Sequence, residues 1–68
     1  MRDTKERIQS EALRLFAENG YHAVTMEQIA AAVGIKAPSL YKHYSGKRAI
    51  FDGIVHQMEA RDLQQARR

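Results

Sequence analysis

The residues best suited to binding chemistry form a basic and aromatic segment in the middle of the chain. No acidic residue occurs between Glu27 and Asp52. That interval contains basic side chains with interleaved rings, namely Lys36, Lys42, Lys47 and Arg48 with Tyr41, His43 and Tyr44. An acid-free segment of this kind has the electrostatic footprint that a polyanion needs. We therefore expect it to bind an acidic polymer, with nucleic acid as the first candidate.

Two short helices joined by a tight turn are expected to position this segment. Ile29, Ala30 and Val33 fall on one face of a helical period. Gly34 interrupts the helix with a residue that tolerates positive φ, and the apolar pattern resumes after it. The small side chain of Ala30 lets two helices cross closely. The pattern predicts a helix-turn-helix at residues 26–44, with a helical hairpin that only packs as the plainer alternative.

The apolar spacing also predicts the elements before the turn. A first helix from about Thr4 to Asn19 has an apolar face formed by Ile8, Ala12, Leu15 and Phe16 and widened by Leu13. Gly20 is expected to close that helix in the left-handed conformation. Thr25 and Gln28 form a predicted capping box at the start of the second helix, which spans about residues 26–33.

The third predicted helix starts where its proline permits. Pro38 is tolerated only in a first turn, so the helix begins near Lys36 or Ala37. It ends at about His43 or Tyr44, before a Ser-Gly break. The outer side of this helix is polar and basic, which suits a DNA major groove.

A fourth helix, over residues 47–67, carries a strong apolar stripe formed by Ile50, Phe51, Ile54, Val55 and Met58. Gly53 weakens its interior by roughly 1 kcal/mol relative to Ala. Beyond Met58 only Leu63 is large and apolar, so this tail has little to pack against. We expect the helix to continue into a partner or domain that this chain lacks, with a frayed terminus as the alternative.

Length and composition exclude several function classes. The 68 residues make one small domain with a net charge of +3 and no cysteine, so disulfides and thiolate metal sites are excluded. No run approaches the roughly 18 apolar residues of a membrane span, and a soluble, cytoplasmic protein is expected. His22, His43 and His56 lack metal-ligand spacing, and no glycine-rich phosphate loop occurs. We expect neither an enzyme nor a cofactor.

Several short motifs follow one another in a fixed order between residue 8 and about residue 58. They are Ala12-Leu13-Arg14-Leu15-Phe16, Gly20-Tyr21, Thr25, Ile29-Ala30, Val33-Gly34-Ile35, Ser39-Leu40-Tyr41-Lys42-His43-Tyr44 and Lys47. In this combination the chain resembles the TetR (tetracycline repressor) family. The resemblance implies an all-α fold, with a three-helix, homeodomain-like helix-turn-helix head at residues 1–46. Residues 47–68 would then form a fourth helix that packs on the head and links it to an absent ligand-binding and dimerisation domain.

The same resemblance implies a function. Family members are mostly bacterial repressors that bind palindromic double-stranded DNA operators as homodimers and release them when a small molecule binds the larger domain. A homodimer is therefore expected for a full-length form, and this segment alone is compatible with a monomer. Small-molecule binding would occur only through the absent domain.

The resemblance further assigns binding roles to individual residues. Four positions are implied to contact phosphate: Thr25, Tyr41, Tyr44 and Lys47. Six positions are implied to face bases or the adjoining backbone: Lys36, Ala37, Pro38, Ser39, Lys42 and His43. One departure is that Lys36 stands where many members have a serine that caps the third helix. Lys36 thus adds positive charge at the groove but does not provide that cap.

A helical protein-interaction module with a basic face is the alternative from another class. Such an interface would be expected to expose aromatic residues or leucines, whereas small and polar side chains interleave between Lys36 and Lys42. A basic amphipathic membrane helix fits less well, because Phe51, Ile54 and Val55 are expected in the core.

Overall fold

The computed structural model describes the backbone of residues 3–66 and the side chains of residues 3–59. Its elements are α1 (Thr4–Asn19), a short 3-10 helix η1 (Tyr21–Ala23), α2 (Met26–Val33), α3 (Ala37–His43) and α4 (Lys47–Ala66). No strand occurs within the described backbone. The predicted all-α fold with a helix-turn-helix is confirmed.

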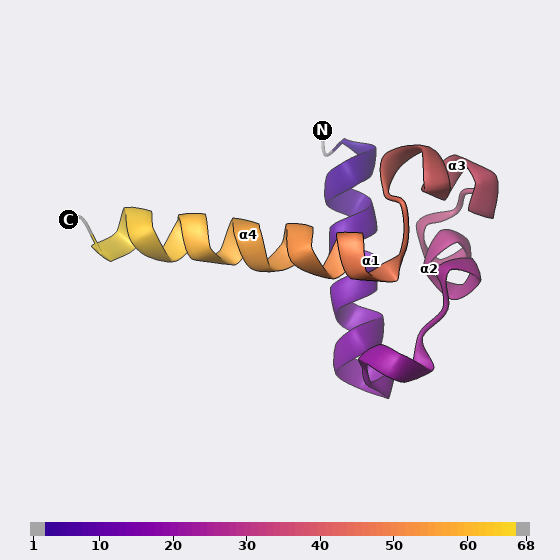
Figure 1. Cartoon of the computed structure of the whole chain (residues 1–68), viewed down its shortest axis with the longest axis horizontal. Helices are drawn as coiled ribbons and strands as arrows, with labels where there is room; N and C mark the ends of the chain where they lie inside the picture. Colours follow the sequence, from indigo (N-terminus) through magenta and orange to yellow (C-terminus); the bar gives the residue numbers. More distant parts are fainter. Residues whose placement is uncertain (1–2, 67–68) are drawn as a thin grey trace.

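The helices surround α1. Figure 1 shows α2 and α3 on one side of α1, while α4 crosses α1 and extends away on the other side. The connection between α3 and α4 passes close to the N-terminal end of α1. Helix α1 packs against both α2 and α4, and α2 packs against α3. The prediction that the tail beyond Met58 has little to pack against concerns residues 59–68. Almost all of their side chains lie outside the described residues. No helix in the described part of the chain is both long enough and apolar enough to cross a membrane.

The end of α1 differs from its prediction. Gly20 has φ 87° and ψ 147°, so it has positive φ but is not in the left-handed helical region. Its N–H still donates to the carbonyl oxygen of Phe16. The extended ψ redirects the chain into η1, and Tyr21 folds back so that its ring centroid lies 5.2 Å from that of Phe16. The left-handed closure predicted for Gly20 is therefore wrong, whereas the contact of Tyr21 with the apolar face is confirmed.

Both ends of α2 follow the sequence prediction. The Thr25 hydroxyl accepts from the N–H of Gln28, and the Gln28 side chain accepts from the N–H of Thr25, which completes the capping box. Gly34 is left-handed at φ 90° and ψ 26°. The N–H groups of Gly34 and Ile35 donate back to the carbonyl oxygens of Ala31 and Ala30, and this pattern of a Schellman motif satisfies the helix end.

The core collects apolar side chains from all four α-helices and from Val24, in the connection before α2. They are Ile8, Ala12, Phe16, Val24, Met26, Ile29, Ala30, Val33, Leu40, Ile50 and Ile54. Three residues predicted on the apolar stripes are substantially exposed, at 45% for Leu13, 39% for Phe51 and 52% for Met58. Leu13 and Met58 line a hollow of about 350 Å³ where α1 and α4 diverge. Phe51 makes edge-type ring contacts with Phe16 and Tyr21, at centroid distances of 6.2 and 5.4 Å. The predicted burial of these side chains is therefore wrong. Leu13 and Met58 stay open because α4 diverges from α1, whereas Phe51 contacts α1 and η1 with only part of its ring.

Candidate nucleic-acid interface

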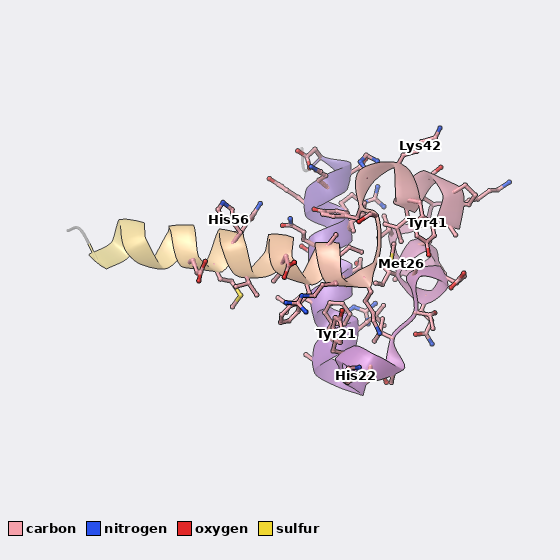
Figure 2. The ribbon with its side chains drawn as sticks, viewed as in Figure 1. Tyr21, His22, Met26, Tyr41, Lys42 and His56 are labelled. Atoms are coloured by element: carbon pink, nitrogen blue, oxygen red, sulfur yellow. The ribbon has the colours of Figure 1, made fainter. Side chains whose placement is uncertain are left out.

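Helix α3 turns almost all of its side chains outward. Leu40 is its only buried residue. Exposed side chains flank it on the polar surface of the helix and at its start, namely Lys36, Pro38, Ser39, Tyr41, Lys42 and His43, with Ala37 half-buried. Figure 2 shows Lys42 extending away from the body of the molecule. The structure thus brings the predicted base-facing residues together on one short, accessible helix.

The start of α3 is closed by backbone rather than by a side chain. Lys36 is the N-cap residue and makes no side-chain cap. Its carbonyl oxygen accepts from the N–H of Ser39 at 2.9 Å and of Leu40 at 3.1 Å. Pro38 lies in the first turn and has no N–H to satisfy. The prediction that Lys36 does not cap α3 with its side chain is confirmed. The Lys36 ammonium makes no hydrogen bond or ion pair with the described residues.

Thr25, predicted to contact phosphate, is exposed at the start of α2. Its hydroxyl oxygen accepts from the Gln28 N–H at 3.1 Å. A hydroxyl has one proton to donate besides its acceptor lone pairs. The Thr25 hydroxyl can therefore cap α2 and donate to an anion at the same time, next to the free N–H groups of the helix end.

The two tyrosines predicted to contact phosphate have different environments. Tyr41 on α3 is 49% exposed and is labelled in Figure 2. Tyr44 follows α3 and is half-buried, with its hydroxyl accepting from Gln9 Nε2 at 2.8 Å. The Lys5 ammonium lies 5.5 Å from the centre of the Tyr44 ring. Tyr41 is free to meet a ligand, whereas Tyr44 also ties the end of α3 to α1.

Lys47 at the start of α4 is already bonded within the protein. Its Nζ donates to the Tyr21 carbonyl oxygen at 2.8 Å and lies 4.4 Å from the centre of the Tyr21 ring. Nζ also donates to the His22 carbonyl oxygen at 3.5 Å, so one of the three ammonium N–H donors remains for an anion. The first turn of α4 has no acidic residue to oppose one. Lys47 therefore joins η1 to α4 and keeps the capacity to bind phosphate.

The basic charge of the interface is concentrated in a few side chains. Arg48 forms an exposed ion pair with Asp52 at 3.0 Å, and this hydrogen bond raises the Arg48 pKa. Lys36, Lys42 and His43 have no acidic partner among the described residues. Arg14 on α1 is instead bonded to Glu11 at 2.8 Å and to Glu18, and the Glu11 hydrogen bond raises its pKa. Lys36 and Lys42 thus carry unpaired positive charge at the start and on the surface of α3, while Arg14 of α1 and Arg48 of α4 are paired with acids locally.

Two polar residues of α1 have contacts that the sequence did not reveal. The Arg7 guanidinium donates to the carbonyl oxygen of Val33 at the end of α2. Gln9 donates to the Tyr44 hydroxyl just after α3. Neither residue belongs to the apolar face, and no pattern in the sequence distinguishes them from other polar helix residues. They stand at the two ends of the segment that carries the predicted base-facing residues.

A sequence pattern described as "Bacterial regulatory proteins, tetR family" matches residues 8–54. The chain belongs to the TetR family. The resemblance predicted from its motifs is confirmed, and the matched part of this TetR-family chain includes α2, α3 and every predicted site residue. The family consists of bacterial regulatory proteins.

Relatives of this TetR-family chain are helix-turn-helix (HTH) regulators of transcription. It is 42% identical over 51 residues to the "biofilm operon icaADBC HTH-type negative transcriptional regulator IcaR" of Staphylococcus aureus, a match covering 75% of this chain and 27% of IcaR. It is 35% identical over 60 residues to the "HTH-type transcriptional regulator UidR" of Escherichia coli K12, covering 88% of this chain and 31% of UidR. The matches thus span less than a third of these relatives. No solved structure matches the chain.

Proposed function

We propose that this chain is the DNA-binding head of a TetR-type transcriptional regulator and acts as part of a repressor. It binds double-stranded DNA sequence-specifically with α3, at about residues 37–43, in the major groove. The main observation in support is that α3 exposes polar and basic side chains and buries only Leu40. A major groove about 12 Å wide accepts an α-helix of this kind. The negative regulation named for IcaR supports the repressor role.

Base contacts are proposed for the outer surface of α3. Lys42 would donate to guanine O6 or N7, and Ser39 would donate to or accept from a base edge. Ala37 and the ring of Pro38 offer apolar surface to a thymine methyl group. Lys36 and His43 would contact a base or the adjoining backbone. These short side chains let the helix approach the bases closely.

Phosphate contacts are proposed to orient the protein on the duplex. Thr25 and Lys47 lie at the starts of α2 and α4, where free N–H groups and the helix dipole favour an anion. Tyr41 would donate its exposed hydroxyl to a phosphate. The Tyr44 hydroxyl accepts from Gln9, so its own proton would be available to donate to a phosphate. Such contacts fix the register, while base contacts select the sequence.

The domain organisation is part of the same proposal. Residues 1–46 form the DNA-binding head, and residues 47–68 link it to a ligand-binding and dimerisation domain. The full-length form would bind a palindromic operator as a homodimer, with a cytoplasmic location and release controlled by a small molecule. The supporting observation is that the matched relatives are more than three times as long as the matched segment.

A protein-interaction module with a basic face is the second candidate. The half-exposed ring of Tyr41 favours it, because interface centres are enriched in tyrosine. The unpaired charges of Lys36 and Lys42 beside that ring favour DNA instead, since charged residues are depleted at protein-interface cores. Binding to an arbitrary duplex separates the two candidates, because only DNA binding predicts it.

The test is fluorescence anisotropy of a labelled random duplex, titrated with the chain over a series of salt concentrations. The expected result is weak binding that falls steeply with salt, because each neutralised phosphate adds about −0.9 to the log–log slope. An operator is then selected from a random pool. If the chain fails to bind at low salt, it is dimerised through a fused coiled coil, which restores the avidity of two half-sites. Failure of the dimerised chain would reject DNA binding and favour the interaction module.

A further inference from the structure

The position of α3 raises a physical problem. A helix that exposes its side chains for binding has few contacts to hold it, and α3 buries only Leu40. One buried side chain fixes a point on a helix but leaves its tilt and rotation weakly determined. Precise base contacts need a fixed orientation, because a bidentate hydrogen bond tolerates little displacement. Other contacts must therefore hold the ends of α3.

We propose that Arg7 and Gln9 of α1 are positioning residues that hold the two ends of α3 and thereby set the DNA sequence specificity of the head. Arg7 holds the turn before α3 through the carbonyl oxygen of Val33. Gln9 holds Tyr44, the C-cap residue of α3, through its hydroxyl. This inference rests on the proposed DNA-binding function. Neither residue is assigned a direct DNA contact.

Arg7 is chemically suited to the turn. The last carbonyl groups of a helix lack partners within the helix and carry the negative end of its dipole. Helix α2 has no basic residue in its own last turn. The Arg7 guanidinium supplies that positive charge from α1 and bonds to the last residue of α2 across 26 positions of sequence. Next to this bond lies Gly34, where the chain turns toward α3.

Gln9 holds the other end at a three-helix junction. Its Nε2 donates to the Tyr44 hydroxyl at 2.8 Å in a half-buried site. Gly53 of α4 provides the space for this pair, since a Cβ there would lie 3.1 Å from Gln9 Nε2 and 3.5 Å from the Tyr44 ring. The N–H of Tyr44 also donates to the Leu40 carbonyl oxygen at 3.1 Å. Holding Tyr44 therefore holds the last turn of α3.

The first experiment needs no DNA. Amide hydrogen exchange is measured by NMR in the unaltered chain, in Gln9→Ala and in Arg7→Met. We expect the amides of Ser39, Leu40 and the C-cap residue Tyr44 to exchange about tenfold faster relative to core amides of α1, since losing such a bond makes local opening more favourable by about this factor. A general loss of stability would instead accelerate α1 and α3 alike, and that outcome would overturn the proposal.

The chain offers matched controls. Arg14→Met removes the same charge from α1, but at a side chain bonded only to Glu11 and Glu18. Gln57→Ala removes an exposed amide from α4. Neither should change the protection of α3 relative to α1. If Arg7→Met fails to fold, Arg7→Lys keeps the charge and alkyl stem and tests the same bond. Gln9→Glu should restore protection, because the Tyr44 hydroxyl can then donate to the carboxylate.

The second experiment compares binding of each variant to the selected operator and to a random duplex. Gln9→Ala should lose about tenfold in the ratio of these affinities with an unchanged salt slope, because it removes no charge. For Arg7→Met, the ratio of operator affinity to random-duplex affinity should also fall about tenfold. Its affinity for the random duplex should fall no further than that of Arg14→Met, which loses the same charge. An unchanged ratio in both variants would overturn the proposal. If neither the unaltered chain nor its coiled-coil dimer binds DNA, the proposed function fails, and the exchange data still decide whether the two residues hold α3.

Discussion

The two helices of the helix-turn-helix are held in opposite ways. Helix α2 buries four of its eight residues, begins with a capping box and ends at left-handed Gly34. Helix α3 buries one of its seven residues and has no side-chain cap. The sequence of α2 thus fixes α2 itself, whereas α3 depends on Leu40 and on bonds from other helices. On the proposed function, α3 exposes its side chains for DNA while α1 takes over part of its positioning.

The largest expected effect on stability comes from Leu40→Ala, which tests this contrast directly. It removes the only buried side chain of α3, and we expect a loss of about 2–5 kcal/mol in the free energy of unfolding. Val33→Ala in α2 should cost less, because three other buried residues still hold that helix. Urea denaturation followed by circular dichroism measures both losses. A smaller loss for Leu40→Ala than for Val33→Ala would show that α3 does not depend on its single anchor.

A second test asks whether the exposed side of α3 serves binding alone. Lys42→Ala should change the stability by less than about 0.5 kcal/mol, because the side chain is exposed and has no bonded partner among the described residues. It should lose about 1–3 kcal/mol of discrimination at one base position of each half-site. Competition binding with single-base variants of the selected operator measures this loss. An equal loss on every sequence would assign Lys42 to phosphate instead.

The turn between the helices provides a third test. Gly34→Ala should cost roughly 1–2 kcal/mol, because alanine is strained at φ 90° and ψ 26°. The nearest side-chain atom to an added Cβ is Arg7 Nη2 at 4.0 Å, so the cost is conformational and not steric. Gly46→Ala is the control, since it has neither positive φ nor an atom within 4 Å of the added Cβ. Equal effects in thermal unfolding would contradict a special role for the turn.

What the sequence could predict follows the same division between α2 and α3. The capping box at Thr25, Gly34 and the start of α3 near Pro38 were predictable, because each depends on residues a few positions apart. The bonds from Arg7 to Val33 and from Gln9 to Tyr44 join residues 26 and 35 positions apart. Polar side chains at such separations leave no periodic signal, so only the fold reveals them.

The same reason explains what the sequence misjudged about the core and the candidate site. Leu13 and Met58 match a helical stripe, yet their burial depends on where α4 diverges from α1, which spacing alone does not give. The site residues could be named from family motifs, because those motifs are local. Their internal bonds could not be named, since the Lys47 bond to Tyr21 again joins distant positions.

A smaller effect is expected from removing the α2 cap. Thr25→Ala removes the hydroxyl that accepts from the Gln28 N–H and should cost about 1 kcal/mol in the free energy of unfolding. It should also weaken binding to every duplex, because the proposed phosphate donor is lost. Thr25→Ser keeps the hydroxyl and serves as the control in both measurements. A full loss of binding in Thr25→Ser would show that the methyl group matters and not the hydroxyl.

The smallest stability effect is expected at the matching position of α3. Lys36→Ser gives α3 a hydroxyl at its N-cap, as Thr25 provides for α2. The backbone there, at φ −86° and ψ 153°, suits an N-cap residue. The gain should be only a few tenths of a kcal/mol, below the usual value of about 1 kcal/mol. Pro38 has no N–H to satisfy, and the Ser39 N–H already donates to the Lys36 carbonyl oxygen.

The same substitution removes an exposed charge at the start of α3, so the slope of log affinity against log salt should become shallower by about one unit. A small gain in stability together with this loss of salt dependence would mean that Lys36 occupies the cap position for its charge. A gain as large as the Thr25→Ala loss, with an unchanged slope, would instead mean that α3 simply lacks a cap. In that case the contrast between the two helices would lie in their local sequences and not in binding.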